Sequence, residues 1–267
     1  MTLEEKSAAV CSLLSAARPV LIAYSGGVDS TVLLALAAET LGAEACAIIA
    51  DSPSLPRQAL IDAISVAEGM GVTPVVLATE ELANPDYANN PPNRCYFCKA
   101  ELFSKMETYA RTHGFRSLAY GENADDMRQV RPGRAAAEAF AVLAPLRDAG
   151  LNKQEIRALA KARSLPNWSA PAQPCLSSRI PHGVPVTADA LARIEAAEAA
   201  VRALDFAVFR VRHVSAPGTP PAARLEIAVA DLARATADWD RLETGLRHAG
   251  FVECELDPNG YRTTAAA

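Results

Sequence analysis

The sequence predicts an α/β fold in which a doubly wound parallel sheet is followed by a smaller C-terminal α+β module. Up to about residue 165, short apolar runs alternate with segments of helical periodicity, and several of these segments end at a glycine, where helices commonly stop. Beyond about residue 180 the order changes to helix, strand, strand, helix and strand, which is typical of a compact α+β unit. We therefore place two domains, at 1–180 and 181–267.

The N-terminal domain repeats a strand followed by a helix. Its first strand, 20–24, is a continuous apolar run, as expected of a strand covered on both faces in a parallel sheet. A Pro- and Asn-rich loop occupies 84–94, segment 125–150 is irregular, and Asn152 is the expected N-cap of the last helix. Further strands are expected at 43–52, 73–81 and 115–123, and helices at 2–17, 29–42, 56–71, 99–114 and 152–165.

The C-terminal module begins after the segment PHGVPVT. The stretch FAVFRVRHV alternates apolar and polar residues, which indicates a strand with one buried face. Strands are expected at 206–214, 223–230 and 251–257, and helices at 187–204 and 231–250.

Composition narrows the class of protein. Half of the 267 residues are apolar and about a fifth are charged, as in a chain that buries a core. The net charge of −5 argues against a broad nucleic-acid-binding face, which needs clustered Lys and Arg. The N-terminus is interpreted as an amphipathic helix rather than a signal peptide, and no apolar run reaches the ~20 residues of a membrane span. We expect a cytoplasmic protein without a membrane partner.

The segment SGGVDS, at 25–30, joins the first strand to its helix and is the first candidate site. Gly26 and Gly27 let the backbone approach an anion, and the helix N-terminus behind them supplies N–H groups and a positive dipole end. Ser25 and Ser30 add hydroxyl donors. Asp29 repels phosphate unless a bound Mg²⁺ bridges the two. The alternative is an ordinary glycine turn with Ser and Asp caps.

The same six residues resemble the loop of the PP-loop ATP pyrophosphatases, which cleave ATP between the α and β phosphates and adenylate a substrate oxygen. This resemblance implies an adenine nucleotide alpha hydrolase-like fold for 1–180. No GK[ST] follows, so the loop is not a Walker loop. Asp51, at the end of the second strand, is placed to meet the adenosine end of ATP, or else it belongs to a strand-end turn.

The cysteines form two groups. Three lie in apolar helix or strand patterns and are expected to be small buried residues: Cys11, Cys46 and Cys254. The others are Cys95 and Cys98, at a loop-to-helix junction after NNPPNR, and Cys175, in a proline-rich loop without core periodicity. A reducing compartment favours a metal or redox site over a disulfide. Three interpretations stay open: a zinc site completed by His182, a [4Fe–4S] cluster with one open iron, and sulfur chemistry on the cysteines themselves.

Taken together, these segments resemble the LarE family, the ATP-dependent sulfur transferases that build the nickel-pincer cofactor of lactate racemase. The resemblance covers most of the chain, from residue 24 to past 210. It is carried by YSGGVDS (24–30), ADSPSLPR (50–57), NRCYFCK (93–99), GENADDMRQVRPGRAAAE (121–138), APLRDAGLNKQEIRALAK (144–161), PCLSSRIPHG (174–183) and FRVRH (209–213).

The resemblance implies a substrate and a reaction. The substrate is a pyridinium dicarboxylate mononucleotide, ATP adenylates its carboxylates with release of pyrophosphate, and sulfur displaces AMP to give thiocarboxylates. Some members sacrifice the sulfur of the cysteine matching Cys175 and leave dehydroalanine. Others hold a [4Fe–4S] cluster on cysteines matching Cys95, Cys98 and Cys175 and relay an added sulfide or the sulfur of a donor. Because all three are present here, we expect the cluster type.

The resemblance also gives roles to further residues. Arg210 and Arg212 alternate on one strand face and would clamp the substrate phosphate, although without the resemblance a solvated charged face is the simpler interpretation. Ser178 and Arg179 would hold substrate or AMP phosphate. Candidates for contacts to ATP near the mouth of its site are Asn123, Asp125 and Arg128, with Asp125 and Asp126 as alternative helix caps. Candidates for substrate or metal contacts are Glu195, Glu198, Glu226 and Asp231, although each of them alone is more simply interpreted as a surface charge.

Other functions share parts of this pattern. A tRNA thiolase carries the same loop and sometimes three cluster cysteines, but the net charge of −5 and the absence of an RNA-binding module speak against it. An amidotransferase-like synthetase would leave the loop cysteines idle. A non-enzymatic metal-binding or scaffold module would leave SGGVDS unexplained. The family forms homo-oligomers, so we expect one here, without a number of subunits.

Overall fold

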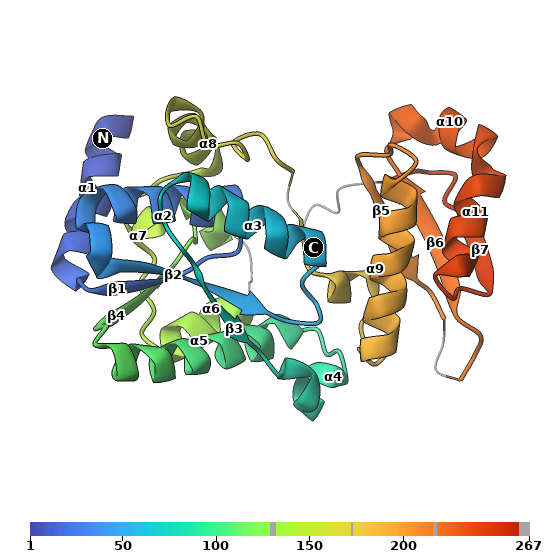
Figure 1. Cartoon of the computed structure of the whole chain (residues 1–267), viewed down its shortest axis with the longest axis horizontal. Coiled ribbons are helices and arrows are strands. Elements are labelled where there is room, and N and C mark those ends of the chain that lie inside the picture. Colours follow the sequence, from blue (N-terminus) through green and yellow to red (C-terminus); the bar gives the residue numbers. More distant parts are fainter. Residues whose placement is uncertain (129–131, 172, 216–217, 262–267) are drawn as a thin grey trace. The chain divides into compact units, whose positions relative to one another are not determined.

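The computed structural model describes residues 1–128, 132–171, 173–215 and 218–261. The chain divides into two compact units (Figure 1). Unit 1 contains Met1–Glu81 and Asn93–Gln173, and unit 2 contains Leu82–Pro92 and Pro174–Ala267. The sequence predicted a single domain boundary near residue 180. In the structure the chain passes from one unit to the other three times, after Glu81, after Pro92 and after Gln173. Within the described residues, no helix is long and apolar enough to span a membrane.

Unit 1 is built on a four-stranded, fully parallel sheet, as the sequence predicted. The strand order is β3-β2-β1-β4, and the register places Val20 beside Ala45 on one side and beside Ser117 on the other. Helices cover both faces of the sheet, so the α/β class and the doubly wound arrangement are confirmed. The strands are β1 (Val20–Ala23), β2 (Ala45–Asp51), β3 (Val75–Ala78) and β4 (Ser117–Tyr120).

The helices of unit 1 follow the predicted order. Thr2 and Asn152 are N-caps of complete capping boxes, which satisfy free N–H groups at the starts of the first and last long helices. The long helices are α1 (Leu3–Ala17), α2 (Val28–Leu41), α3 (Arg57–Gly69), α5 (Arg94–His113) and α8 (Lys153–Ala162), the shorter ones are α6 (Pro132–Ala139) and α7 (Pro145–Asp148), and 3₁₀ turns lie at Gly42–Glu44, Glu81–Ala83 and Ala124–Arg128.

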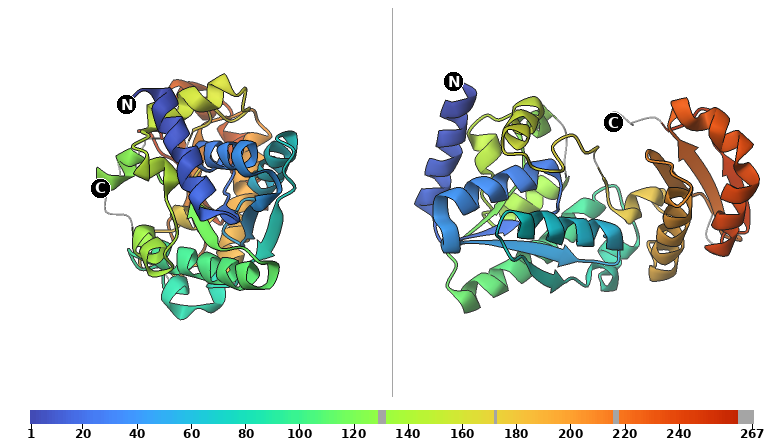
Figure 2. Two further views of the ribbon diagram at one scale, coloured as in Figure 1. Left: turned by 90° about the vertical axis from the view of Figure 1, so that its left-hand side faces the viewer. Right: turned by 45° about the horizontal axis from the view of Figure 1, so that its top comes forward.

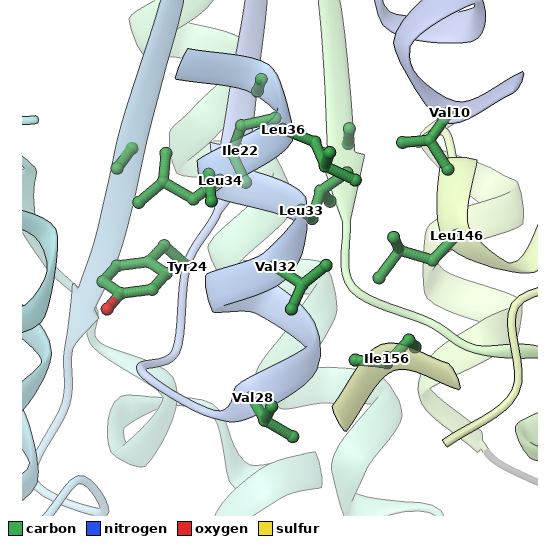
Figure 3. Close-up of a cluster of buried hydrophobic side chains, with 14 of the residues drawn as sticks. Val10, Ile22, Tyr24, Val28, Val32, Leu33, Leu34, Leu36, Leu146 and Ile156 are labelled. Atoms are coloured by element: carbon green, nitrogen blue, oxygen red, sulfur yellow. The ribbon is translucent and has the colours of Figure 1, made fainter. Parts of the chain in front are cut away.

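The core of unit 1 has two layers, one on each face of the sheet. Side chains alternate along β1, so Ile22 faces a layer with Val32, Leu33 and Leu36 of α2, whereas Leu21 faces α5 and α6. Figure 3 shows the first layer, in which side chains of β1, α1, α7 and α8 meet α2. Figure 2 shows α2 and α5 on opposite sides of the sheet. This packing fixes the N-terminus of α2 at the carboxyl edge of β1.

Two predictions for unit 1 are wrong, one about where a helix begins and one about a segment expected to be irregular. Helix α5 begins at Arg94, five residues before the predicted start, because the prolines at 91 and 92 end the preceding segment and nothing after them blocks a helix. Segment 125–150 was expected to be irregular but contains α6 and α7. Both short helices begin at a proline, and α6 is alanine-rich, which favours helix at that point.

Unit 2 contains a three-stranded mixed sheet of order β5-β6-β7, antiparallel between the first two strands and parallel between the last two. Its helices pack on one face, where Phe209, Val211, Leu225 and Ile227 are buried. The predicted helix 231–250 is two helices, because the backbone bends at Asp238. The elements are α9 (Ala188–Arg202), β5 (Phe209–His213), β6 (Ala222–Ile227), α10 (Leu232–Ala237), α11 (Trp239–His248) and β7 (Glu253–Leu256), with 3₁₀ turns at Leu176–Arg179 and Val229–Asp231.

The segment 82–92 belongs to unit 2 and contains α4 (Pro85–Ala88). Asn90 is fully buried and donates from its side-chain amide to the carbonyls of Ile180, Pro181 and Val184, at 2.8 to 3.3 Å. Segment 82–92 therefore fixes the path of the chain just after Cys175.

Candidate functional site

The loop between β1 and α2 presents a glycine-lined helix N-terminus. Gly26 has a φ of +74°, and Gly27 is the exposed N-cap position of α2. The Ser30 hydroxyl donates to the Gly27 carbonyl at 2.9 Å and lies 3.1 Å from the Ser25 hydroxyl. The Asn167 amide donates to the Gly26 carbonyl at 2.8 Å. These hydrogen bonds fix the backbone of the loop at the carboxyl edge of the sheet, which is the edge where open parallel sheets bind ligands.

The two glycines of this loop should differ sharply in their tolerance of alanine. A Cβ on Gly26 would lie 2.8 Å from the Ala63 Cβ on α3, and its positive φ disfavours any L side chain. A Cβ on Gly27 would meet only the Ser25 Oγ, at 3.5 Å. We expect Gly26→Ala to lower the free energy of unfolding by about 2 kcal/mol and Gly27→Ala to change it little, as measured by urea denaturation. Equal losses would contradict the close packing of the loop on α3.

Asp29 lies in the first turn of α2 and is the centre of a polar cluster. Lys153 Nζ lies 2.8 Å from both carboxylate oxygens, and the Asn123 amide donates to Oδ2 at 3.3 Å. Asn123 Oδ1 accepts from the Asp125 N–H, and the Asp125 carboxylate accepts from the Lys153 N–H at the start of α8. The predicted residues Asp29, Asn123 and Asp125 therefore lie in one cluster. Asp125 also accepts a hydrogen bond at the N-terminus of α8, in line with the alternative prediction that it is a helix cap.

The carboxyl ends of β2 and β3 carry a second group of polar residues. Asp51 ends β2 and forms an ion pair with Arg57, whose other nitrogen donates to the Ser52 carbonyl at 2.7 Å. The Ser52 hydroxyl donates to the buried Glu81 carboxylate. Asp51 is therefore tied to the first residue of α3 in this structure.

A buried ionic network follows β4. Glu122 accepts from Arg134 Nε at 2.9 Å, from Arg147 Nη1 at 2.8 Å and from the Tyr120 hydroxyl at 2.6 Å. Burial alone would raise the pKa of Glu122, but these hydrogen bonds outweigh it and hold that pKa below its ordinary value. Burial, followed by the hydrogen bond to this carboxylate, raises the pKa of Tyr120. This network fixes the segment that carries Asn123 and Asp125.

Cys95 and Cys98, which were predicted at a loop-to-helix junction, lie inside the helix, at the start of α5. Residues three apart on a helix share a face, so the two side chains leave the helix on the same side. Cys95 is exposed and Cys98 is half-buried. A helix N-terminus favours nearby negative charge, which suits a thiolate. All six cysteines lie in the described part of the chain, and none forms a disulfide.

Cys175 belongs to a loop that a buried ion pair holds in place. Arg179 pairs with Glu198 of α9 through two bonds, at 2.8 and 3.0 Å, and both side chains are almost completely buried. The remaining guanidinium nitrogen donates to the Pro174 carbonyl at 2.7 Å and to the Ser178 hydroxyl at 2.9 Å. In this structure Arg179 and Glu198 therefore shape the loop around Cys175.

Arg210 and Arg212 lie on the polar face of β5, as the alternation predicted, since the residues between and beside them are buried. Arg212 donates to Glu226 of β6 at 3.0 Å and to the Ser178 carbonyl at 3.0 Å. Burial, followed by the positive charge of Arg179, lowers the pKa of Arg210. This unit therefore brings together Ser178, Arg210, Arg212 and Glu226 in one polar patch, and a bound anion would stabilise its arginines.

The other predicted residues lie apart from these groups or outside what is described. Asp231 precedes α10 and lies 3.7 Å from Arg234. Glu195 is half-buried on α9, and the side chain of Arg128 lies outside the described residues. Within the described residues no three His, Cys, Asp or Glu side chains are grouped to hold a metal. Cys95 and Cys98 belong to unit 1 and Cys175 to unit 2, so their joint ligand set stays a prediction.

Sequence reasoning missed three residues that shape the loop site. Lys153 was predicted only as a residue of a helix. A lysine directly after an N-cap lies at the positive end of the helix dipole, which is unfavourable unless a negative charge is nearby, and this signal could have identified it. Gly121 allows β4 to approach α2, because a Cβ there would lie 2.7 Å from the Ser30 nitrogen. Asn167 follows α8 and reaches Gly26, a contact that no local pattern signals.

Comparison with known proteins places these features in a family. No protein-family model matches the chain. It is 39% identical to an uncharacterised protein of Synechocystis over 91% of this chain and 90% of that protein. It is 28% identical to an uncharacterised protein of Methanocaldococcus jannaschii over 73% of this chain and 74% of that protein. It is 31% identical to the pyridinium-3,5-bisthiocarboxylic acid mononucleotide synthase of Lactiplantibacillus plantarum over 98% of this chain and 94% of that protein. The chain therefore belongs to the LarE family, that of this synthase.

Proposed function

We propose that this protein is an ATP-dependent sulfur transferase that converts the carboxylates of a pyridinium-3,5-dicarboxylate mononucleotide to thiocarboxylates. The observation that carries the proposal is the glycine loop at the N-terminus of α2, with Asp29 held in its first turn by two other segments. Membership in the family of a pyridinium-3,5-bisthiocarboxylic acid mononucleotide synthase supports the substrate class.

The loop would bind the phosphates of ATP. Gly26 and Gly27 expose backbone at the positive end of α2, and Ser25 and Ser30 add hydroxyl groups. Asp29 is a partly exposed carboxylate beside this anion site, which suits a Mg²⁺ ion that neutralises phosphate charge when bound. Asp51 lies at the carboxyl end of the neighbouring strand, where the adenosine part of ATP would bind.

The reaction would proceed in two displacements at each carboxylate. A carboxylate oxygen attacks the α phosphorus, the bond from that phosphorus to the bridging oxygen breaks, and pyrophosphate leaves. A sulfur nucleophile then attacks the acyl carbon, and AMP leaves with the electron pair of the broken carbon–oxygen bond. Arg210 and Arg212 would hold the substrate phosphate, since both lie on the polar face of β5.

The sulfur would arrive through Cys95, Cys98 and Cys175. One observation in unit 1 supports this set, since Cys95 and Cys98 share one face at the start of a helix. The inclusion of Cys175 rests on the membership in the family. A [4Fe–4S] cluster bound by the three thiolates would supply an open iron site for an added sulfide.

Asp29→Asn tests the assigned role of the loop. We expect the variant to lose pyrophosphate release from ATP in the presence of the dicarboxylate mononucleotide, because the amide cannot serve Mg²⁺ as a carboxylate does. The measurement is a coupled pyrophosphate assay, with direct titration of the mononucleotide to show that substrate binding is retained. Glu39→Gln, an exposed carboxylate at the other end of α2, is the matched control. Pyrophosphate release that persists in Asp29→Asn would refute the role.

A further inference from the structure

The last described residues of the chain return to the sheet of unit 2 and bring an aromatic side chain to it. The Gly260 N–H donates to the Asp257 carbonyl at 3.1 Å and closes a turn. The Tyr261 N–H then donates to the Ile227 carbonyl at 2.6 Å, and Tyr261 forms a parallel bridge with Ala228. The backbone of Tyr261 is therefore fixed beside the end of β6.

Glycine is required in the turn that delivers Tyr261. Gly260 is buried and has a φ of +67°, which disfavours any L side chain. A Cβ at this position would lie 2.8 Å from the Ile227 carbonyl oxygen, which is the acceptor of the Tyr261 N–H. The chain therefore lies directly against β6 at this point, which holds the next residue at one position on the sheet.

The ring of Tyr261 lies over Arg210, one of the two arginines proposed to hold the substrate phosphate. The guanidinium carbon of Arg210 is 5.0 Å from the ring centroid, within the ~6 Å limit of a cation–π contact. An aromatic face carries no formal charge, so the contact orients the guanidinium and does not neutralise it. Burial and the positive charges of Arg179 and Arg212 lower the pKa of Arg210, so a bound anion would stabilise this cation.

We propose that Tyr261 is a positioning residue for the substrate phosphate, which acts by holding the guanidinium of Arg210 in the polar patch of β5. The inference rests on the proposed function, because it takes Arg210 and Arg212 as the residues that hold this phosphate. An arginine side chain loses rotamer freedom when it binds a ligand, and a side chain that is already held in place loses less. Tyr261 therefore raises the affinity for the phosphate through Arg210 rather than by a contact of its own.

The role of the ring can be separated from the fold of unit 2. Because the backbone of Tyr261 makes the hydrogen bond to β6, replacing the side chain leaves that bond in place. The side chain is half-buried and is not part of the buried apolar core. Tyr261→Phe retains the aromatic face, whereas Tyr261→Leu retains an apolar side chain without that face, so the pair of variants isolates the cation–π contact.

The test compares two ligands by calorimetric titration of the full chain: the pyridinium-3,5-dicarboxylate mononucleotide and the same nucleoside without its phosphate. Tyr261→Leu should weaken binding of the mononucleotide roughly three- to tenfold and leave binding of the nucleoside unchanged. Tyr261→Phe should bind the mononucleotide within about twofold of the wild type. In an Arg210→Met background, Tyr261→Leu should cause no further loss, because the ring acts through Arg210.

Arg193→Met is the matched control, because Arg193 is also half-buried and lies over an aromatic ring of unit 2, that of Phe251 at 5.7 Å, with no assigned role. Its affinity for the mononucleotide should equal that of the wild type. Equal losses for both ligands in Tyr261→Leu, no loss for either, or a further loss in the Arg210→Met background would refute the inference. Wild-type protein that binds the mononucleotide no better than the nucleoside would instead overturn the proposed phosphate-binding role of Arg210 and Arg212, which separates the two failures.

Discussion

Replacing Cys95, Cys98 or Cys175 with alanine is expected to abolish thiocarboxylate formation while leaving pyrophosphate release intact. In the proposed mechanism the acyl adenylate would form at the α2 loop without a thiol, whereas delivery of sulfur by the cluster route would need all three thiolates. Protein prepared and reconstituted without air should contain iron and sulfide, and each variant should lose them. The measurements are iron and sulfide quantification, electron paramagnetic resonance, and mass spectrometry of the product.

Cys254→Ala is the control for these variants, since Cys254 is a half-buried cysteine on β7 with no assigned role in sulfur delivery. Its iron content and product yield should match the wild type. Active Cys95→Ala and Cys98→Ala variants beside an inactive Cys175→Ala would contradict the cluster route. Dehydroalanine at Cys175 after turnover would then identify that residue as the sulfur itself.

Glu198→Ala is expected to cause the largest loss of stability among the predicted site residues. The variant leaves the Arg179 guanidinium buried without its carboxylate, and both side chains are almost fully buried. Removing one partner of such a buried pair lowers the free energy of unfolding by about 3–5 kcal/mol. Because Arg179 also holds the carbonyls of Pro174 and Cys175, the Cys175 loop should loosen. Chemical denaturation measures the first effect, and the rate of thiol labelling at Cys175 the second.

An exposed ion pair in the same unit provides the comparison. Arg247 and Glu243 pair across one turn of α11 near solvent, so Glu243→Ala should lower the free energy of unfolding far less than Glu198→Ala does. Equal stability of Glu198→Ala and Glu243→Ala would mean that the buried pair does not hold the loop. Such a result would favour the other interpretation of Glu198, as a contact to substrate or metal, which the resemblance suggested.

Most of unit 1 was predictable from local patterns. Buried strands gave continuous apolar runs, and the glycines at 42 and 114 marked helix ends. The boundary of α5 was not predictable in the same way, because the NNPPN segment before it resembles a loop that extends through the cysteines. Cys95 and Cys98 were therefore predicted just before the helix, whereas they lie in its first turns, where their side chains share one face.

The candidate site was predictable in part. SGGVDS marked the candidate anion loop because its residues are contiguous and each has a local physical role. Lys153 and Asn167 were missed because they reach the loop from more than a hundred residues away. Arg179 and Glu198 were predicted as ligand contacts, but residue type alone does not distinguish a substrate-binding charge from a buried pair. The fold shows that the two side chains are buried and paired with each other, and their roles as ligand contacts stay predictions.

Simultaneous measurement of pyrophosphate and thiocarboxylate tests the central claim most directly. The protein is incubated without air with ATP, Mg²⁺, the pyridinium-3,5-dicarboxylate mononucleotide and sulfide, and the products are followed by a pyrophosphate assay and mass spectrometry. We predict one pyrophosphate released for each oxygen replaced by sulfur, and no product when ATP is omitted. Thiocarboxylate formed without ATP, or ATP cleaved without any sulfur entering the mononucleotide, would contradict the account.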